Sequence, residues 1–305
     1  MNSKRSVTFA LGMAVVIGWP YIAAANDDFE VSVRVDAASE HNSNVSVSEL
    51  EQATGESDRA LVLDFAVDAH WKPKTAMSVD FGYNYSDRRY REFSEFDLAM
   101  HLLYGDVSYD FSHYTVGANY YFADAELGGE GFMKLHQRSL YAARLFADAW
   151  YVRAAVTQSE KIFATLGERN ADTLGYSIDA FYFFNEGRSF FLIGANYDDE
   201  DARNDAFSYQ GNSLRLRYSH RFNLWRRDAR IQLGYRWQDR DYQGITPAIE
   251  QRRDDRHQVL EARLEVPVLD KLSVISLVER GDYRSNLDSA DYDETRVSLG
   301  LRFSF

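Results

Sequence analysis

The sequence predicts an all-β fold, namely a transmembrane, antiparallel, up-and-down β-barrel of about 14 strands. Apolar and polar residues alternate along the chain from Phe29 to Phe305, and no helical stripe is long enough to compete with that pattern. Aromatic residues make up 15% of the chain, and membrane barrels place such residues in girdles at the two lipid interfaces. The expected connections alternate between short and long, as periplasmic turns and surface loops do in outer-membrane barrels. Together these observations predict a location in the outer membrane of a Gram-negative bacterium.

The first 25 residues have the three-part order of a secretory signal peptide. Two basic residues precede an apolar run at residues 7–18, and Ala23 and Ala25 occupy the A-x-A positions before the expected cleavage site. The run is shorter than the about 20 apolar residues that a spanning helix needs, which disfavours the alternative of an uncleaved anchor. We therefore expect a signal peptide at residues 1–25 and a barrel at residues 26–305.

The strand segments are recognised by their period of two. Between Ala229 and Gln238, apolar residues alternate with Arg, Gln and Gly, so one face of the segment is apolar and the other polar. Such segments number about fourteen, and each has the roughly ten-residue length of a tilted membrane strand. They begin near Phe29, Arg59, Ala76, Leu98, Tyr114, Ser139, Tyr151, Asp172, Ser189, Ser213, Asp228, His257, Leu272 and Thr295.

The connections predict which end of the barrel is which. Short ones such as residues 71–75 and 184–188 are typical of periplasmic turns, and both ends of the mature chain then lie on the periplasmic side. A soluble β-sandwich also alternates and is the competing fold, but it does not account for the alternation in loop length. Long polar loops are expected at residues 38–58, 87–97, 125–135, 158–171, 200–210, 242–256 and 284–293.

The last segment resembles an assembly signal. Val297, Leu299 and Leu301 alternate with polar or small residues, and the sequence ends with Phe303, Ser304 and Phe305. A final alternating strand that ends in Phe resembles the targeting signal that the barrel-assembly machinery reads in outer-membrane proteins. We expect that machinery to be a partner during biogenesis, with Phe303 and Phe305 as determinants. Outer-membrane lipid and lipopolysaccharide are expected around the finished barrel.

The composition argues against several functional classes. There is no Cys, and therefore no disulfide framework, lipidation cysteine or thiol chemistry. A formal net charge of -13 disfavours nucleic acid as a partner. No phosphate-binding loop, metal-spaced cluster or nucleophile motif appears, so we expect no cofactor, no metal and no enzymatic activity. The acidic stretch at residues 198–205 lacks the spacing of a calcium loop and is interpreted as a solvated surface loop.

The inward faces of the strands carry the most informative chemistry. Early strands place acidic side chains toward the lumen and later strands place arginines there, which predicts a charge-segregated wall. Two alternatives remain open: the charges could pair across the lumen and close it, or inward Phe181, Phe183, Phe190 and Leu192 could narrow one side. The predicted lumen charges are Asp64, Asp68, Asp80, Asp106 and Asp110, with Arg215, Arg217, Arg221, Arg230, Arg236, Arg240, Arg263 and Arg302.

Short segments in the last third carry a resemblance to a known family. They resemble the C-terminal barrel of the surface lipoprotein assembly modifier family. The resemblance implies a fourteen-stranded barrel that usually follows a periplasmic tetratricopeptide domain; only Asn26 to Asp28 precede the first expected strand, so no such domain is expected here. In size and strand count the chain is also similar to monomeric porins of the outer-membrane protein G type. The segments are Arg240-Asp241-Tyr242, Arg252-Arg253-Asp254-Asp255-Arg256, Ser285-Asn286-Leu287, and Tyr292-Asp293 leading into Thr295-Arg296-Val297-Ser298-Leu299-Gly300-Leu301.

The sequence favours a porin-like function: transport of small polar or charged solutes, filtered by lumen charges and surface loops. The alternative belongs to another class, that of an assembly or export accessory for surface lipoproteins or other surface components, and the family resemblance suggests it. An accessory predicts a surface lipoprotein or periplasmic partner, whereas a pore conducts alone. Fold by itself does not decide between them.

Overall fold

The computed structural model describes residues 28–50 and 52–305. The predicted signal peptide, with Ala23 and Ala25, lies outside the described residues. Within them the chain forms strands joined by turns, loops and single-turn 3-10 helices. The strands of the barrel are β1 (Phe29–Asn42), β4 (Asp58–Lys74), β5 (Met77–Tyr90), β6 (Leu98–Asp110), β7 (Thr115–Leu127), β8 (Glu130–Phe146), β9 (Trp150–Phe163), β10 (Ala171–Phe184), β11 (Ser189–Ala202), β12 (Tyr209–Leu224), β13 (Arg227–Thr246), β14 (Gln251–Pro267), β15 (Leu272–Ser285) and β16 (Tyr292–Ser304).

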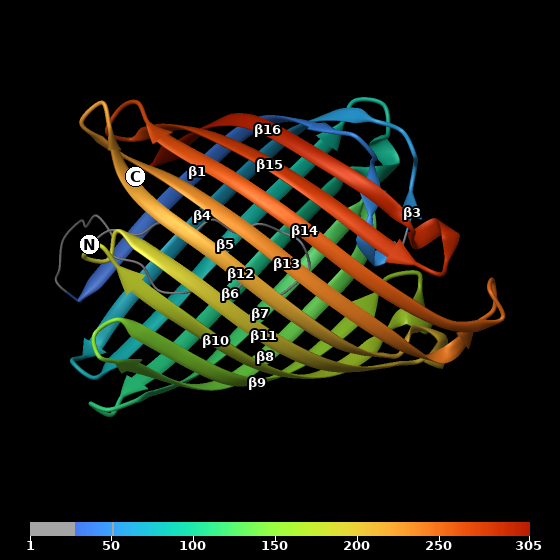
Figure 1. The fold of residues 1–305 in the computed structure, drawn as a ribbon, viewed down its shortest axis with the longest axis horizontal. Coiled ribbons are helices and arrows are strands. Elements are labelled where there is room, and N and C mark those ends of the chain that lie inside the picture. The colour runs from blue at the N-terminus through green and yellow to red at the C-terminus, as the bar shows by residue number, and fades with distance from the viewer. Residues whose placement is uncertain (1–27, 51) are drawn as a thin grey trace.

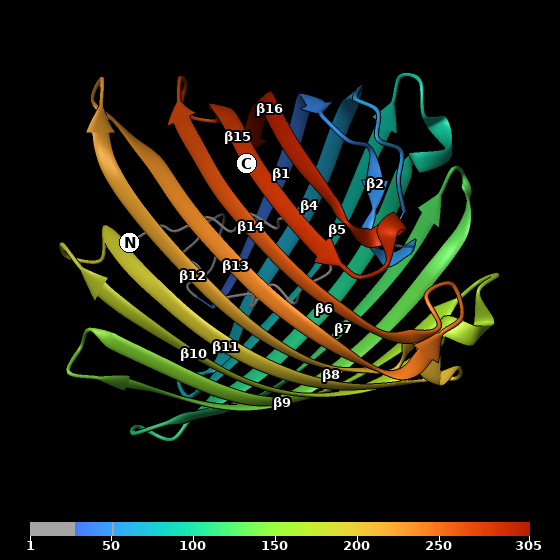
Figure 2. The ribbon, with the colours of Figure 1, turned by 45° about the vertical axis from the view of Figure 1, so that its right-hand side comes forward.

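These strands form one closed antiparallel barrel, in which every strand pairs with its neighbours in chain order and β16 returns to pair with β1 (Figures 1 and 2). Closure leaves no strand edge, so all backbone donors and acceptors at membrane depth find partners within the sheet. The predicted up-and-down barrel of 14 strands is confirmed. The remaining strands, β2 (Ser46–Val47) and β3 (Gln52–Ala53), pair only with each other, within the first surface loop.

Strand register separates an apolar outer face from a polar inner face. On β16, Val297, Leu299 and Leu301 are exposed on the outside, whereas Arg302 between Leu301 and Phe303 is buried on the inside. The same alternation places Ile178 of β10 outward and Asp179 inward. Among the described residues, no helix has the length and hydropathy to cross a membrane. The outer face is therefore the lipid-facing surface of a membrane barrel.

Two of the predicted surface loops are wrong. Residues 125–135 were expected to be a long loop, but β7 and β8 meet there at a tight turn of Gly128 and Gly129. Both glycines have positive φ, and a Cβ on Gly128 would lie only 3.1 Å from the backbone oxygen of Glu95 in the neighbouring loop. Residues 242–256 are likewise mostly strand, because β13 and β14 extend beyond the expected boundaries as a protruding hairpin.

Surface loops in this barrel are closed at their ends by a hydrogen bond from a backbone N–H to a polar side chain. Asp97 accepts a hydrogen bond from the backbone N–H of Tyr90 at 2.6 Å, and Asn170 accepts one from Phe163 at 2.8 Å. In each case a side chain just before the next strand caps the last residue of the preceding one, since the sheet ladder ends there. Single-turn helices lie in these loops: η2 (Ser94–Phe96), η3 (Gly167–Arg169), η4 (Asp205–Phe207) and η5 (Asp288–Ala290).

The C-terminal residue completes the seam between β16 and β1. Phe305 donates its backbone N–H to the carbonyl of Val33 at 2.9 Å and accepts from the N–H of Val33 at 3.1 Å. Its ring lies 5.0 Å from the ammonium of Lys271, at the end of the barrel where the short turns lie. Phe303 and Phe305 are both exposed on the outer face, as the assembly-signal prediction requires, but that role stays a prediction.

Deletion of Phe305 is expected to lower the amount of protein in the outer membrane, because it removes both the terminal aromatic ring and the last backbone pair of the seam. Outer-membrane fractionation followed by immunoblotting measures this amount. Phe305→Tyr is the control, since it keeps the backbone pair and an aromatic ring. Unchanged membrane levels after the deletion would contradict the expectation.

The lipid-facing register is tested at mid-strand of β10. Ile178 is 51% exposed on the outer face, and an Arg there near the bilayer midplane should cost about 2 to 4 kcal/mol of folding free energy. Ser177→Arg should cost little, because its side chain faces the lumen beside the carboxylate of Asp179. Refolding titrations into lipid vesicles compare the two variants. Equal costs would show that the assigned faces are wrong.

Candidate functional site

The lumen is the candidate site, and the strand register places every predicted lumen charge on its wall. The acidic group from β4, β5 and β6 and the arginines from β12, β13, β14 and β16 all share the face opposite the exposed apolar residues. Asp110 lies at the periplasmic rim, where its carboxylate accepts the backbone N–H of Ser112 at 2.8 Å. Whether these residues act on a solute stays a prediction.

The segregation of charge is less complete than the sequence suggests. Arg302 is buried between Asp36 of β1, at 2.6 Å, and Glu265 of β14, at 3.0 Å. Arg215 pairs with Asp179 of β10 at 2.8 Å. Asp36 and Asp179 were absent from the sequence prediction, although both have the same inward parity as their neighbours in the alternating pattern.

The acidic side of the lumen is held by hydrogen bonds to neighbouring polar groups. Asp80 lies 2.8 Å from His70, and Asp68 accepts from the Tyr104 hydroxyl at 2.6 Å. Tyr141 donates to Asp106 at 2.8 Å in the same way. A carboxylate that accepts such bonds is stabilised where it stands, because each charged hydrogen bond replaces lost hydration. The contact of Asp80 is therefore with a neighbouring strand on the acidic side of the lumen.

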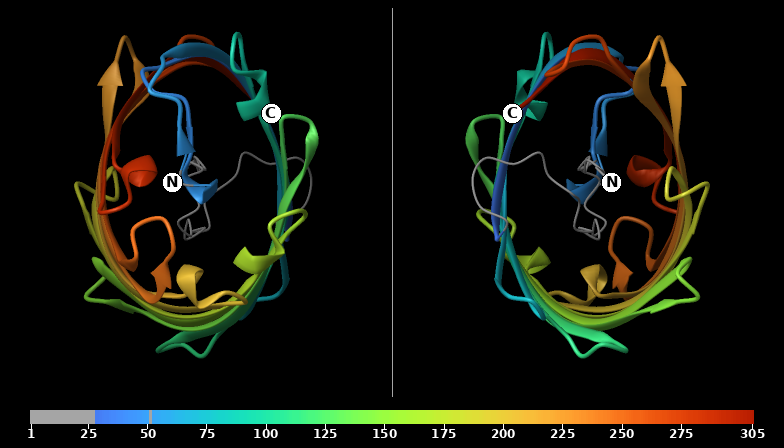
Figure 3. Two further views of the ribbon diagram at one scale, coloured as in Figure 1. Left: turned by 90° about the vertical axis from the view of Figure 1, so that its right-hand side faces the viewer. Right: turned by 90° about the vertical axis from the view of Figure 1, so that its left-hand side faces the viewer.

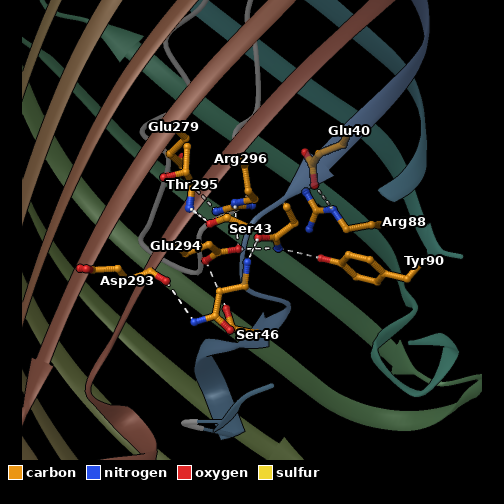
Figure 4. Close-up of polar contacts among 12 residues, drawn as sticks. Glu40, Ser43, Ser46, Arg88, Tyr90, Glu279, Asp293, Glu294, Thr295 and Arg296 are labelled. Carbon is orange, nitrogen blue, oxygen red and sulfur yellow. Dashed lines mark hydrogen bonds and ion pairs between the residues drawn. The ribbon is translucent and has the colours of Figure 1, made fainter. Parts of the chain in front are cut away.

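Near the outer mouth, a buried polar cluster centres on Glu294 of β16 (Figure 4). Its carboxylate accepts from Asn42 of β1 at 2.6 Å and from Ser46 of the first surface loop at 3.2 Å, and it lies 3.4 Å from the guanidinium of Arg296. Arg296 also pairs with Glu279 of β15. The cluster therefore ties three strands and a loop together across the β16–β1 seam.

The first surface loop, residues 43–57, is fixed to this cluster by its first half. Ser43 exchanges hydrogen bonds with the backbone of Thr295, and the amide of Asn44 donates to the carbonyl of Asp293 at 3.0 Å. Val45 is fully buried against Ala60 and Tyr90. Polar contacts on one side and apolar packing on the other hold the loop in a single inward direction.

From this anchor the loop extends across the mouth of the lumen. Figure 3, a view along the barrel, shows its β2–β3 segment inside the ring of strands. Its 3-10 helix η1 (Ser48–Leu50) contacts the β9–β10 loop, where Arg169 donates to the carbonyl of Glu49 at 3.0 Å. Arg169 lies in the β9–β10 loop, nearly opposite the β1–β4 loop in the order of strands around the ring.

A second polar cluster lies on β9, β11, β12 and β13. Lys161 of β9 pairs with Glu200 of β11 at 2.7 Å, and Glu200 also accepts from the Tyr209 hydroxyl at 3.1 Å. Arg240 stacks on the ring of Tyr209 at 4.9 Å. Glu49 acts electrostatically on both Lys161 and Arg240. Attraction between the loop tip and these cations favours the inward position.

Below the loop, six arginines lie on neighbouring strands of one wall, which we call the basic wall. Arg215 is directly opposite Arg236 in the ladder, and Arg221 is directly opposite Arg230. Two carboxylates, Glu261 and Glu265 of β14, face inward among them, and Glu265 is bound to Arg302. The basic wall consists of Arg215, Arg217, Arg221, Arg230, Arg236 and Arg263.

A cavity of about 110 Å³ spans the β16–β1 seam on the inside of the barrel. Charged groups of both signs line it, including Arg34, Asp64 and Glu279. It is large enough for a few water molecules, and its polar lining gives them partners. Phe181 and Leu192 are buried on the inner face of β10 and β11, and whether they narrow the lumen stays a prediction.

Comparison with known proteins gives a family. A model of the surface lipoprotein assembly modifier family matches residues 27–305. The chain belongs to this family. The match covers the entire barrel, whereas the motifs recognised in the sequence lie in its last third. No curated protein matches the chain.

Solved structures similar to this family member are outer-membrane barrels. In-vitro folded OmpT, an outer membrane protein of Vibrio cholerae, aligns with a TM-score of 0.55 over 93% of this chain and 99% of its own, at 10% identity. An anion-selective porin from Comamonas acidovorans aligns with a TM-score of 0.52 over 91% of this chain and 99% of its own, also at 10% identity. At this identity the likeness shows the fold alone: a barrel of the outer-membrane type.

Removal of the central carboxylate should destabilise the barrel. Glu294→Ala removes the shorter of the two hydrogen bonds that buried Asn42 donates and leaves Arg296 with one fewer counter-charge, so the variant should lose about 3 to 5 kcal/mol of unfolding free energy. Urea unfolding in detergent, followed by tryptophan fluorescence, measures the loss. Glu130→Ala, at the exposed β7–β8 turn, is the matched control. Similar midpoints for the two variants would contradict the proposed role of the cluster.

Proposed function

We propose that this barrel is an outer-membrane accessory in the assembly of surface lipoproteins, and that its lumen is closed at the outer mouth when no client is engaged. The observation that carries the proposal is the first surface loop, anchored at Glu294 and reaching Arg169 across the mouth. The family match over residues 27–305 supplies the class of client.

A freely diffusing pore needs an open, solvated path, and the loop contacts work against one. Val45 is buried in an apolar cluster, and the loop tip accepts a hydrogen bond from Arg169. These interactions must be broken for the loop to leave the lumen, so opening requires a ligand or partner with a differential affinity for the open state. A lipoprotein or a periplasmic partner protein is the candidate for that role.

A solute channel is the second candidate, and the charged lumen below the loop supports it. The basic wall faces a side of the barrel that carries Asp64, Asp68, Asp80 and Asp106, and fixed charges of opposite sign bias the ions that enter a pore. Neither candidate is an enzyme. Both place the barrel among outer-membrane lipid and lipopolysaccharide, after insertion by the barrel-assembly machinery.

The accessory function is tested by surface display. In a deletion strain, lipoproteins that depend on the barrel should remain at normal total levels but become resistant to protease added to intact cells. Mass spectrometry of the shaved peptides identifies them. Complementation with the wild-type chain should restore cleavage, and Glu130→Ala serves as a surface-altered control. An unchanged set of surface lipoproteins would contradict the proposal.

Planar-bilayer recording of the same purified barrel separates the two candidates. The wild-type barrel should be silent, and replacement of residues 44–56 by a short Gly-Ser turn should produce steady conductance. The β1–β4 pairing of Asn42 with Asp58 just before the loop keeps the hairpin intact in that variant. Steady conductance of the wild-type barrel, with no loss of surface lipoproteins in the deletion strain, would contradict the accessory function and favour the solute channel.

A further inference from the structure

The basic wall has an arrangement that is unfavourable for a ligand-free lumen. Arg215 and Arg236 are direct cross-strand neighbours, and so are Arg221 and Arg230. Directly opposite side chains on adjacent strands have their Cβ atoms only about 5 Å apart, and like charges at that spacing repel. Two such pairs on one wall create a local excess of positive charge.

The nearby carboxylates compensate this excess only in part. Asp179 is bound to Arg215, Glu265 is bound to Arg302, and Glu261 lies 3.8 Å from Arg263. In the part of the chain that the structure describes, the side chains of Arg217 and Arg236 have neither an ion pair nor a hydrogen bond. Both are only partly exposed, so water screens their charges incompletely.

Beside the arginines lies an apolar shelf formed by Phe181, Phe183, Phe190 and Leu192. Leu192 is directly opposite Arg217 in the ladder, and Phe190 is opposite Ser219. The rings of Phe183 and Phe190 lie 6.0 Å apart and are partly exposed, near the periplasmic turn between β10 and β11. A molecule entering from the periplasm therefore meets apolar surface and positive charge together.

We propose that the basic wall and the apolar shelf form a binding site for a small anionic amphiphile, with its oxyanion on Arg217 and Arg236 and its apolar body on Phe183 and Phe190. Arginine suits this task, because its planar group donates two parallel hydrogen bonds to a phosphate or carboxylate. An oxyanion bound there also offsets the repulsion between Arg236 and its cross-strand neighbour Arg215. The site lies on the periplasmic side of the first surface loop and does not depend on the proposed function.

Gly234 provides the space for this ligand. Gly234 of β13 lies between Arg217 of β12 and Glu261 of β14 in the ladder. Because it is glycine, no side chain of β13 fills the space between them. A Cβ there would meet only the Cβ of Glu261, at 3.5 Å, so the position is open toward the lumen. The open row lets the ligand approach the guanidinium groups of Arg217 and Arg236.

Calorimetric titration of the full barrel in a non-ionic detergent tests the site, with hexyl phosphate, hexanoate, inorganic phosphate and hexanol as probes. Hexyl phosphate or hexanoate should bind more tightly than inorganic phosphate and hexanol, and the stronger of the two identifies a phosphate or a carboxylate ligand. Arg217→Gln combined with Arg236→Gln should weaken that binding by about tenfold or more. Added salt should weaken it as well.

Arg138→Gln, which removes one positive charge from the exposed outer face of β8, is the control and should bind like the wild type. Arg236→Glu gives a second readout: it should abolish binding and raise the unfolding midpoint, because the new carboxylate faces Arg215. Equal binding of hexyl phosphate and hexanol would overturn the oxyanion assignment, and equal binding of hexyl phosphate and inorganic phosphate would overturn the shelf. A lower midpoint for Arg236→Glu would show that the arginine is structural, which would overturn the site.

Discussion

Closure of the sheet at the β16–β1 seam is the constraint on which the rest of the structure depends. In lipid an unpaired backbone group costs several kcal/mol, so fourteen strands are stable in the membrane only as a ring. Backbone hydrogen bonds between β16 and β1 form the seam, and the last pair joins Phe305 to Val33. It is reinforced inside the barrel by Arg302, which joins β16 to Asp36 of β1 and to Glu265 of β14.

Once the ring is closed, its outer face must be apolar, and the polar residues of each strand are directed into the lumen. Charges confined there lose part of their hydration and need partners, which explains the pairs that line the wall. The pairing is uneven. Around Glu294 nearly every polar group has a contact, whereas the basic wall has more arginines than acids. The cluster around Glu294 therefore holds its strands together, whereas the basic wall leaves positive charge that an anion can bind.

The alternating pattern was enough to predict the fold and the side on which each residue lies. It could not give partners, because these depend on the register of strands far apart in the sequence. Arg215 reaches Asp179 over Gly194, where any Cβ would collide with the carboxylate, and no local signal reveals that contact. The missed parts of β8 and β13 also have a physical reason. Both contain a register shift, which interrupts the period of two on which strand recognition depends.

The inward fold of the first surface loop was equally hidden, because residues 43–57 have the polar composition of an ordinary loop. Its position follows from the seam. The residues that anchor it, Asp293, Glu294 and Thr295, begin β16, and Asn42 ends β1. They come together only when the last strand pairs with the first, so the loop cannot take its place in an open sheet. Closure of the barrel therefore also sets the position of the loop, and a partner that shifted the loop would act on the same seam that completes the fold.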